Sequence, residues 1–268
     1  MANLGTKDKF GTQVKEYDKY RTTYPKEFYD YVFRISKIEN AKDILDLGCG
    51  TGKSTEPLYR KGLNLVGCDH DKRMLEQAKE NARHQDLPIK YVLGNSESLP
   101  FGEEVFDIVN VGNAFHWFAN LESVQEIKRI LRPNGLLFIH WKQIGKEDVE
   151  LRRKIFRQFN PEYNGSGILI TPETVIGLLE NQGFYDMRTL TKKYKFKYNL
   201  ESAVGRLKTG GNYFRLFSKQ KVDFESIAKG VFEDYLSEKG RIEFLSTTQI
   251  VYAYKGESGG EELSQKFY

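Results

Sequence analysis

Three glycines spaced by two, Gly48, Gly50 and Gly52, end an apolar run that carries a single acid, Asp46. They are followed by a segment with helical character at 54–61. A buried strand that turns through glycines into the start of a helix lets a ligand lie against bare backbone. This stretch therefore predicts ligand binding, and the residues at neighbouring strand ends should indicate which ligand is bound.

Two common glycine-rich turns fit these positions poorly. A phosphate-binding loop requires Gly-x4-Gly-Lys-Ser/Thr, and its first glycine would fall on Leu47, inside the predicted strand. A dinucleotide-binding turn requires Gly-x-Gly-x-x-Gly, in which the third glycine lets the helix pack on the strand. That glycine would fall on Lys53. The phosphate loop is therefore excluded, and the dinucleotide turn is a weak match.

A nucleoside that carries an amino-acid tail fits the polar residues better. Asp46 can accept a hydrogen bond from the ammonium of the tail, and Asp69, at the end of the second predicted strand, can accept from both ribose hydroxyls. Ser96 and Glu97 follow the third predicted strand, where the purine edge would lie. The alternative is that Asp46 only caps the following turn and that Glu97 is a surface acid. Acidic or polar residues follow three successive predicted strands, and this repeated placement favours nucleoside binding over the alternative.

Alternating strands and helices position these residues. Helical patterns separate the apolar runs, and this alternation predicts a mostly parallel, doubly wound α/β sheet with helices on both faces. Ligands bind such sheets at the carboxyl ends of the strands, where the glycine turn lies. The predicted strands are 44–47, 63–69, 89–93, 105–111 and 136–141, and the predicted helices between them are 54–61, 71–84 and 121–131.

Several motifs in this order resemble those of the class I S-adenosylmethionine-dependent methyltransferases, over roughly residues 10–141. The resemblance implies a Rossmann-like sheet of seven strands whose last strand is antiparallel. Strand 241–255 would then insert beside the fifth, and S-adenosylmethionine would be the cofactor. The motifs are Leu45-Asp-Leu-Gly-Cys-Gly-Thr-Gly52, Gly67-Cys-Asp69 with Met74-Leu-Glu-Gln-Ala78, Glu97-Ser-Leu-Pro-Phe101, Phe106-Asp-Ile-Val109 and Arg129-Ile-Leu-Arg-Pro-Asn-Gly135.

The resemblance also implies where the cofactor is bound. Its contacts should come from the glycine turn, the end of the second strand, the turn after the third strand, the loop after the fourth strand and the N-terminal segment. No metal site is predicted. The predicted cofactor-binding residues are Asp46, Gly48, Cys49, Gly50, Asp69, His70, Met74, Asn95, Ser96, Glu97, Asn113, Tyr20 and Arg21.

The element His116-Trp117-Phe118 after the fourth strand is similar to one in a small-molecule branch, the trans-aconitate methyltransferase-like enzymes. That branch also resembles this chain at Tyr20-Arg21 and Tyr24-Pro25, although Thr22 stands where the branch has proline. The likeness implies a small-molecule acceptor. It does not extend past residue 145, where such enzymes select their acceptors, and it leaves the acceptor open.

Methyl transfer from a sulfonium is an in-line displacement, and holding the reactants in line supplies much of the acceleration. A carboxylate acceptor therefore needs no dedicated catalytic residue. A hydroxyl or amine acceptor needs a base, for which His116 is the candidate, with an aromatic packing role as its alternative. Arg21 is the candidate for pairing with an acidic substrate.

The chain is predicted to be one domain of 268 residues. Residues 10–24 have helical spacing and form either a lid over the site or a plain amphipathic helix. The predicted parts are a lid segment at 1–24, a cofactor-binding core at 40–142, a helical insertion after the fifth strand at 143–240 that selects the acceptor, the final strand at 241–255 and a flexible tail at 256–268.

The bulk composition argues against several other classes. The chain has 41 basic and 37 acidic residues and no apolar run long enough for a membrane helix, and its first residues do not show the apolar core expected of a signal peptide. With two cysteines, it is expected to be cytoplasmic. Nucleic acid is an unlikely partner, because amino-methyltransferases of nucleic acids carry Asp/Asn-Pro-Pro-aromatic where this chain has Asn113-Ala-Phe-His116. A non-catalytic cofactor-binding protein and a methyltransferase of macromolecules remain as alternatives, and the oligomeric state stays open.

Overall fold

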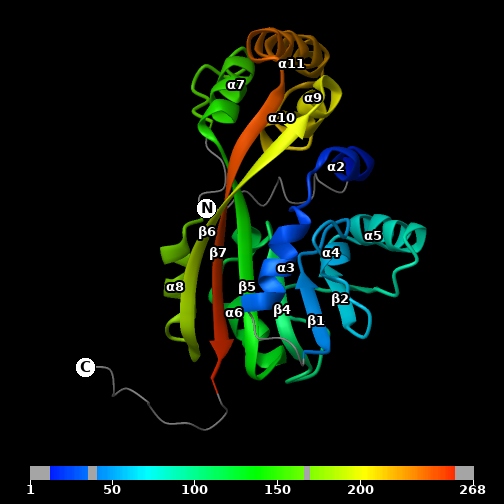
Figure 1. Ribbon diagram of the computed structural model, residues 1–268, viewed down its shortest axis with the longest axis vertical. Helices are drawn as coiled ribbons and strands as arrows, with labels where there is room; N and C mark the ends of the chain where they lie inside the picture. The colour runs from blue at the N-terminus through cyan, green and yellow to red at the C-terminus, as the bar shows by residue number, and fades with distance from the viewer. Residues whose placement is uncertain (1–12, 36–40, 166–169, 257–268) are drawn as a thin grey trace. The chain divides into compact units, whose positions relative to one another are not determined.

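The computed structural model of the protein describes residues 13–35, 41–165 and 170–256 (Figure 1). The chain divides into two compact units, each built from segments that are distant in sequence. Unit 1 draws its described residues from Met1–Pro25, Trp141–Leu169 and Thr191–Gln249, and unit 2 from Lys26–His140, Ile170–Leu190 and Ile250–Tyr268. The predicted insertion at 143–240 supplies most of unit 1, whereas the single-domain description stays a prediction.

The described residues form a seven-stranded sheet in the order β3-β2-β1-β4-β5-β7-β6. The arrows in Figure 1 show that β7 runs opposite to its neighbours β5 and β6. The expected seven-stranded, mostly parallel sheet with an antiparallel last strand beside the fifth is therefore confirmed. The strands are β1 (Asp43–Leu47), β2 (Asn64–Asp69), β3 (Lys90–Leu93), β4 (Phe106–Gly112), β5 (Leu131–Ile144), β6 (Phe184–Tyr198) and β7 (Ile242–Lys255).

Strand β1 lies inside the sheet, between the parallel strands β2 and β4. Its residues Ile44, Leu45 and Leu47 are buried, because a parallel strand is covered by helices on both faces and needs a nearly continuous apolar sequence. Strands β4 and β5 follow the same rule, with Asn110 and His140 as buried polar exceptions. These exceptions lie next to the candidate site.

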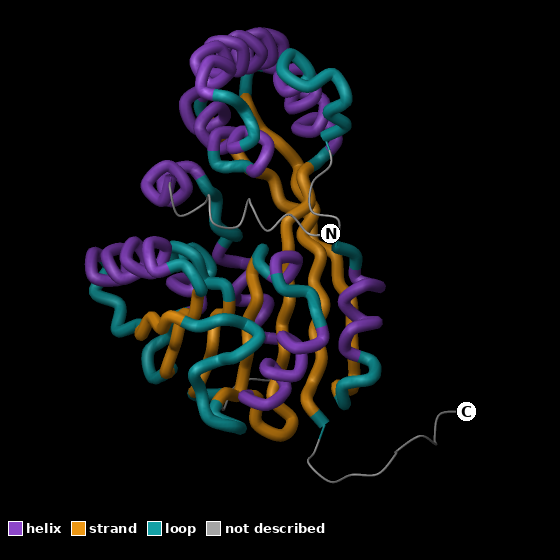
Figure 2. The backbone as a smooth tube through the Cα atoms, turned by 180° about the vertical axis from the view of Figure 1, so that it is seen from behind, coloured by secondary structure: helices purple, strands orange, loops and turns teal. Residues whose placement is uncertain are grey.

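The helices of unit 2 cover both faces of its part of the sheet. Helix α3 packs against α4 on one face, and α6 packs against α8 on the other (Figures 1 and 2). Helix α5 packs against β2 and β3 and begins after its N-cap residue Asp71, whose side chain accepts a hydrogen bond from the Arg73 amide. The helices are α3 (Lys26–Ile35), α4 (Thr55–Leu58), α5 (Lys72–His84), α6 (Leu121–Ile130) and α8 (Pro172–Leu179).

Two predicted boundaries in unit 2 are wrong. The helix expected at 54–61 is the single turn α4. Strand β5 begins at Leu131, five residues before the expected start, and residues 132–135, which separate the predicted helix 121–131 from the predicted strand, form a bulge inside β5. Leu131 pairs with Phe106 and the ladder resumes where Leu136 pairs with Ile108, so the four residues between them loop out. The chain therefore does leave the ladder at these residues, but inside a longer strand rather than before one.

Unit 1 has its own core of aromatic and aliphatic side chains. Helix α11 packs against α7 and α9, and the buried rings of Phe156 and Phe224 meet with centroids 5.3 Å apart. The helices are α2 (Val14–Tyr20), α7 (Lys146–Phe156), α9 (Leu200–Lys208), α10 (Gly211–Phe214) and α11 (Ser218–Lys239).

Helix α2, which lies in the predicted lid segment, packs on α9 within unit 1. The Tyr20 hydroxyl donates to the Glu201 carboxylate over 2.9 Å, and the Lys19 ammonium donates to the same oxygen over 2.6 Å. A Cβ at Gly205 would lie 2.5 Å from the Tyr20 ring, so the ring rests directly on the backbone of α9. The predicted tail lies outside the described residues from 257 onward.

Gly205→Ala should therefore detach α2 from α9, because the added methyl group would occupy the place of the Tyr20 ring. We expect faster proteolysis and faster amide exchange within α2, with little change in the rest of unit 1. Gly230→Ala is the matched control, since a Cβ at Gly230 would meet nothing within 4 Å in α11. That control should stabilise the protein by about 0.5–1 kcal/mol. Equal protection of α2 in both variants would contradict the docking.

Candidate functional site

The glycine turn after β1 has a backbone that requires glycine. Gly48, Gly50 and Gly52 have φ values of 71°, 55° and 88°, in the left-handed region that other residues rarely adopt. Gly48 is also closely packed, because a Cβ there would lie 2.5 Å from the Cβ of Ala114 and 3.3 Å from the Phe118 ring. The turn therefore lies directly against the loop after β4.

Hydrogen bonds attach this turn to the end of β2. The amides of Gly48 and Cys49 donate to the Cys68 carbonyl over 2.8 and 3.1 Å, and the Gly50 amide donates to Asp69 Oδ2 over 2.8 Å. Burial raises the pKa of the Cys49 thiol, which keeps it neutral and unreactive. The turn and the carboxylate at the end of β2 thus form one rigid element.

Asp69 is predicted to bind ribose hydroxyls. Its Oδ1 accepts from the Asp71 amide over 2.9 Å and lies 3.2 Å from His70 Nδ1, while its Oδ2 accepts from Gly50. Each carboxylate oxygen can accept more than one hydrogen bond, so these contacts leave capacity for a ligand. Met74, another predicted contact, is near the turn, because its Cε lies 3.6 Å from where a Cβ of Gly50 would be.

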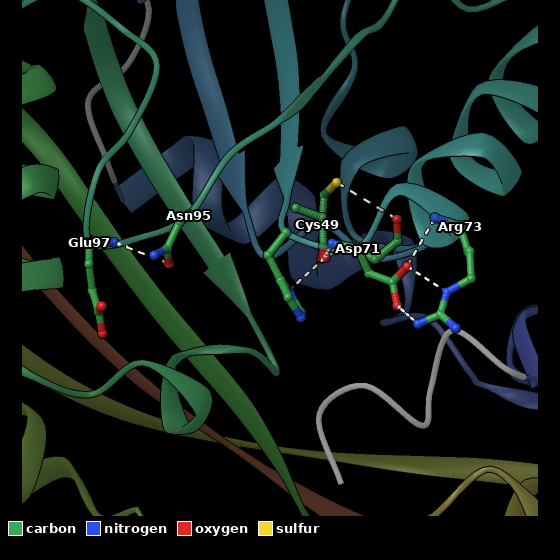
Figure 3. Close-up of polar contacts among 8 residues, drawn as sticks. Cys49, Asp71, Arg73, Asn95 and Glu97 are labelled. Carbon is green, nitrogen blue, oxygen red and sulfur yellow. Dashed lines mark hydrogen bonds and ion pairs between the residues drawn. The ribbon is translucent and has the colours of Figure 1, made fainter. Parts of the chain in front are cut away.

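A charged pair stabilises the start of α5 beside Asp69. Arg73 donates from Nε to Asp71 Oδ1 over 2.9 Å and from Nη2 to Oδ2 over 2.7 Å (Figure 3). Although burial pushes the pKa of Asp71 upward, the hydrogen bonds and charge of Arg73 bring it below its ordinary value. Arg73 was not among the residues predicted for the site.

Asp46 is fully buried and already has three donors. Its Oδ2 accepts from Ser54 Oγ over 2.8 Å and from Thr55 Oγ1 over 2.6 Å, and its Oδ1 accepts from Asn110 Nδ2 over 2.6 Å. Burial raises the pKa of Asp46 to about 6, although these hydrogen bonds oppose the shift. Asp46 thus joins β1 to the start of α4 and to β4, and its predicted contact with an ammonium stays a prediction.

The hydrogen bonds of Asp46 continue through Asn110 to His140, two residues that the sequence analysis missed. His140 Nε2 lies 3.1 Å from Asn110 Oδ1, which can only accept, so Nε2 carries the proton. Burial lowers the pKa of His140 to about 3, and the ring stays neutral beside Phe28, with centroids 4.8 Å apart. A polar residue within an otherwise apolar strand was the available signal at both positions.

His140 also anchors the loop after β4 that carries the His-Trp-Phe element. Its carbonyl accepts from the amide of Asn113, which has a φ of 53°, over 2.8 Å. His116 lies in the short helix η3 (Phe115–Trp117), and its ring centroid is 4.8 Å from that of Trp117. One buried residue of β5 therefore contacts both the Asp46 network, through its side chain, and this loop, through its backbone.

The turn after β3 is attached to the start of α6. Ser96 is buried, and its hydroxyl lies 3.0 Å from that of Ser123. Glu97 accepts from Asn120 Nδ2 over 2.7 Å, while the Glu97 amide lies 3.5 Å from Asn95 Oδ1. Figure 3 shows Asn95 and Glu97 on this turn, and Cys49, Asp71 and Arg73 near the ends of β1 and β2. The predicted residues of unit 2 therefore follow the ends of neighbouring strands.

Tyr20 and Arg21, the remaining predicted contacts, belong to unit 1. Tyr20 packs on α9, and Arg21 donates from Nη2 to the Thr209 carbonyl over 3.0 Å. Their predicted contact with the cofactor stays a prediction.

The described part of the chain contains neither a cluster suited to a metal ion nor a helix suited to a membrane. No cluster of three or more His, Cys, Asp or Glu residues there is arranged to hold a metal ion. No helix there combines the length and apolar character needed to cross a membrane.

Comparison with known proteins agrees with this geometry. Residues 45–139 match the family model described as a methyltransferase domain. An uncharacterized methyltransferase of Mycobacterium tuberculosis is 35% identical over 132 residues, which are 49% of this chain and 51% of that protein. A probable S-adenosylmethionine-dependent methyltransferase of Saccharomyces cerevisiae is 33% identical over 141 residues, 50% of this chain and 46% of its own length. The chain spans about half the length of the curated relatives it matches.

Among solved structures, a phosphoethanolamine N-methyltransferase of Haemonchus contortus, in complex with S-adenosyl-L-methionine, has the same fold. The TM-score is 0.58 at 15% identity, and the match covers 96% of this chain and 61% of that one. Residues 45–139 thus carry the sequence of a methyltransferase domain, within a seven-stranded sheet of the Rossmann-like methyltransferase fold.

Proposed function

We propose that the protein binds S-adenosylmethionine and transfers its methyl group to a small-molecule acceptor. The observation that carries this proposal is the attachment of the glycine turn to Asp69, through the Gly50 amide at 2.8 Å. It places a carboxylate beside bare backbone at the ends of β1 and β2. That pairing suits a nucleoside whose ribose has two free hydroxyls and whose tail carries no phosphate.

The proposed roles follow from the contacts of each group. Gly48 and Gly50 offer backbone without side chains, and Asp69 accepts from the ribose hydroxyls. Ser96 and Glu97 lie on the turn where the purine edge is expected. Asp46, which is buried with three donors, positions the turn through Ser54 and Thr55. When bound, the cofactor supplies an electrophilic methyl group on a good leaving group.

Orientation is the main contribution of the protein to such a reaction, because displacement at the methyl needs the acceptor in line with the carbon–sulfur bond. A carboxylate acceptor is already nucleophilic at neutral pH. For a hydroxyl or amine acceptor, we propose His116 as the base that removes the proton. Its loop is fixed at Asn113 by the His140 carbonyl and, through Phe118, lies against Gly48.

Direct binding and turnover measurements on the full chain test this proposal. Calorimetry should show binding of S-adenosylmethionine and S-adenosylhomocysteine, with no binding of NAD. Tritiated S-adenosylmethionine should then label small carboxylic acids or alcohols in an acceptor screen. Failure to bind S-adenosylmethionine would contradict the function. Binding without labelling of any small acceptor, or labelling confined to macromolecules, would overturn the small-molecule part.

If His116 is the base, His116→Ala should lower kcat by about 100-fold for a hydroxyl or amine acceptor, at the low end of what a positioned base contributes. The loss should be greatest near neutral pH, where an imidazole is partly deprotonated, and should be small for a carboxylate acceptor. The measurement is the pH profile of kcat for both acceptor types. An equal loss at every pH would instead indicate that the ring only packs against Trp117.

A further inference from the structure

A network of buried hydrogen bonds, formed by Asp46, Asn110 and His140, joins three strands beside the candidate site. Asp46 of β1 accepts from Asn110 Nδ2 of β4 over 2.6 Å, and Asn110 Oδ1 lies 3.1 Å from Nε2 of His140 on β5. The three side chains are 0%, 2% and 1% exposed, so water does not compete for these bonds. The proposed function gives a role to Asp46 but none to Asn110 or His140.

The carboxylate sets the direction of each bond in this network. Ionised Asp46 can only accept, so Asn110 turns its NH2 group toward Asp46 and its carbonyl toward His140. Nε2 of His140 must then be the donor. Burial lowers the pKa of His140 to about 3, so the ring is neutral and carries its proton on Nε2. Because turning over the amide or changing the tautomer would break both bonds, the network has a single arrangement.

Close packing holds the His140 ring in place. Its centroid is 4.8 Å from that of Phe28 and 5.5 Å from that of Phe138. The ring also lies against β4, because a Cβ at Gly112 would be 2.8 Å from Cε1 and 3.0 Å from Nε2 of His140. The same Cβ would lie 3.1 Å from Ser54 Oγ. The ring, the start of α4 and the end of β4 therefore come together at Gly112.

The two ends of the network hold two loops of the candidate site, the glycine turn at 48–52 and the loop after β4 at 113–118. At one end, Asp46 accepts from Thr55, the first residue of α4, over 2.6 Å. At the other end, the His140 carbonyl accepts from the amide of Asn113, the first residue after β4, over 2.8 Å. The relative placement of the two loops thus depends on this network as well as on their direct contact at Gly48.

We propose that His140 is a positioning residue that keeps these two loops in one placement relative to each other. Its side chain acts on the glycine turn through Asn110 and Asp46, and its carbonyl acts on the loop that carries His116. In the proposed function, the turn binds the methyl donor and the loop supplies the candidate base. That the placement serves methyl transfer rests on this function, because in-line displacement requires close alignment and a small shift lowers the rate.

Amide hydrogen exchange on the full protein, without any ligand, tests the placement itself. His140→Leu removes the donor to the buried Asn110 carbonyl and the ring that supports the end of β4. Both loops should then exchange about tenfold faster, as expected for the loss of one hydrogen bond. His140→Gln, whose side-chain amide can donate from nearly the place of Nε2, should restore their protection. If either loop keeps wild-type protection in His140→Leu, His140 does not position both.

A second variant displaces the ring without removing a polar group. Gly112→Ala would add a methyl group against His140 and Ser54, and it should also loosen both loops. Gly177→Ala in α8 is the matched control, since a Cβ there would meet nothing within 4 Å. Ile139→Val controls for loss of packing, because Ile139 is fully buried beside His140 on β5. Loosening of the two loops by either control would contradict a specific role for His140.

Turnover separates positioning from stability. With tritiated S-adenosylmethionine and an acceptor labelled in the screen described above, His140→Leu should lower kcat by up to about 100-fold, the cost of a small misplacement. Affinity for S-adenosylmethionine should change little, because the bond between Gly50 and Asp69 lies outside the network. His140→Gln should recover most of kcat. A residue that only stabilises the fold would lower the melting temperature and leave kcat unchanged well below it, and that result would overturn the proposal.

The two proposals fail separately. If S-adenosylmethionine does not bind, the proposed function is overturned, and joint loosening of the two loops in His140→Leu still shows that His140 positions them. If S-adenosylmethionine binds and is turned over, but His140→Leu keeps wild-type kcat or wild-type exchange, the positioning role is overturned and the function stands.

Discussion

Asp69→Ala should weaken binding of S-adenosylmethionine by about 1000-fold, the largest loss of affinity expected for any single change in the site. Two hydrogen bonds from ribose hydroxyls to an ionised carboxylate are worth about 4 kcal/mol together, and about 1.4 kcal/mol corresponds to tenfold. The variant also releases the Gly50 amide, which Asp69 holds at 2.8 Å. Calorimetry on the full chain is the measurement.

Two other substitutions separate these effects. Asp69→Asn keeps an acceptor for the Gly50 amide but loses the charge, so it should bind more tightly than Asp69→Ala and less tightly than the wild type. Asp223→Ala removes an exposed acid from α11 and should leave affinity unchanged. Wild-type affinity in a folded Asp69→Ala variant would refute the ribose assignment.

Asp46→Ala should lower the free energy of unfolding by about 3–5 kcal/mol, the largest loss of stability expected in unit 2. The substitution leaves the hydroxyls of Ser54 and Thr55 and the amide of Asn110 without their common acceptor in a buried place. Asp46→Asn, which has nearly the same shape, should cost much less at neutral pH. Urea unfolding of the full chain gives both values, and equal losses in the two variants would contradict this account.

The pH dependence of Asp46→Asn follows from the raised pKa. Because burial moves the pKa of Asp46 from 3.8 to about 6, the native state binds more protons than the unfolded state between these values. The contribution of Asp46 to stability therefore falls as pH rises through this window, by on the order of 3 kcal/mol. Asp46→Asn lacks this loss, so its stability relative to wild type should increase from pH 4 to pH 7. A constant difference would show that Asp46 titrates normally.

Much of the fold could be predicted because the apolar runs are short, regular and separated by clear stops. The first strand, the glycine turn and the capped start of α5 all depend on neighbours within a few residues. The place of β7 beside β5 came instead from a family resemblance, since periodicity says nothing about which strands pair. The bulge at 132–135 was misplaced because its Pro and Gly are compatible with both a strand end and an interruption.

The sequence indicated the site residues whose side chains are of a type that contacts a ligand. It did not indicate the residues whose partner is another side chain of the same protein. Asn110 meets Asp46 across 64 residues and His140 across 30. Similarly, nothing local to Tyr20 predicts that its ring lies on Gly205. Such pairings depend on how the strands and helices pack in the folded chain, which a single sequence does not display.

The position of β7 between β5 and β6 has a consequence for biosynthesis. Strand β6 ends more than 40 residues before β7 begins, and β5 ends earlier still. During translation, both strands therefore leave the ribosome before β7, the strand that pairs with each of them. Their unpaired backbone groups can form hydrogen bonds with another chain, which leads to aggregation. Strand β6 carries the exposed Lys193, Lys195 and Lys197, whose mutual repulsion discourages pairing with another chain. We expect these lysines to limit aggregation of β6 before β7 is synthesised, and they lie on the edge strand of the finished sheet.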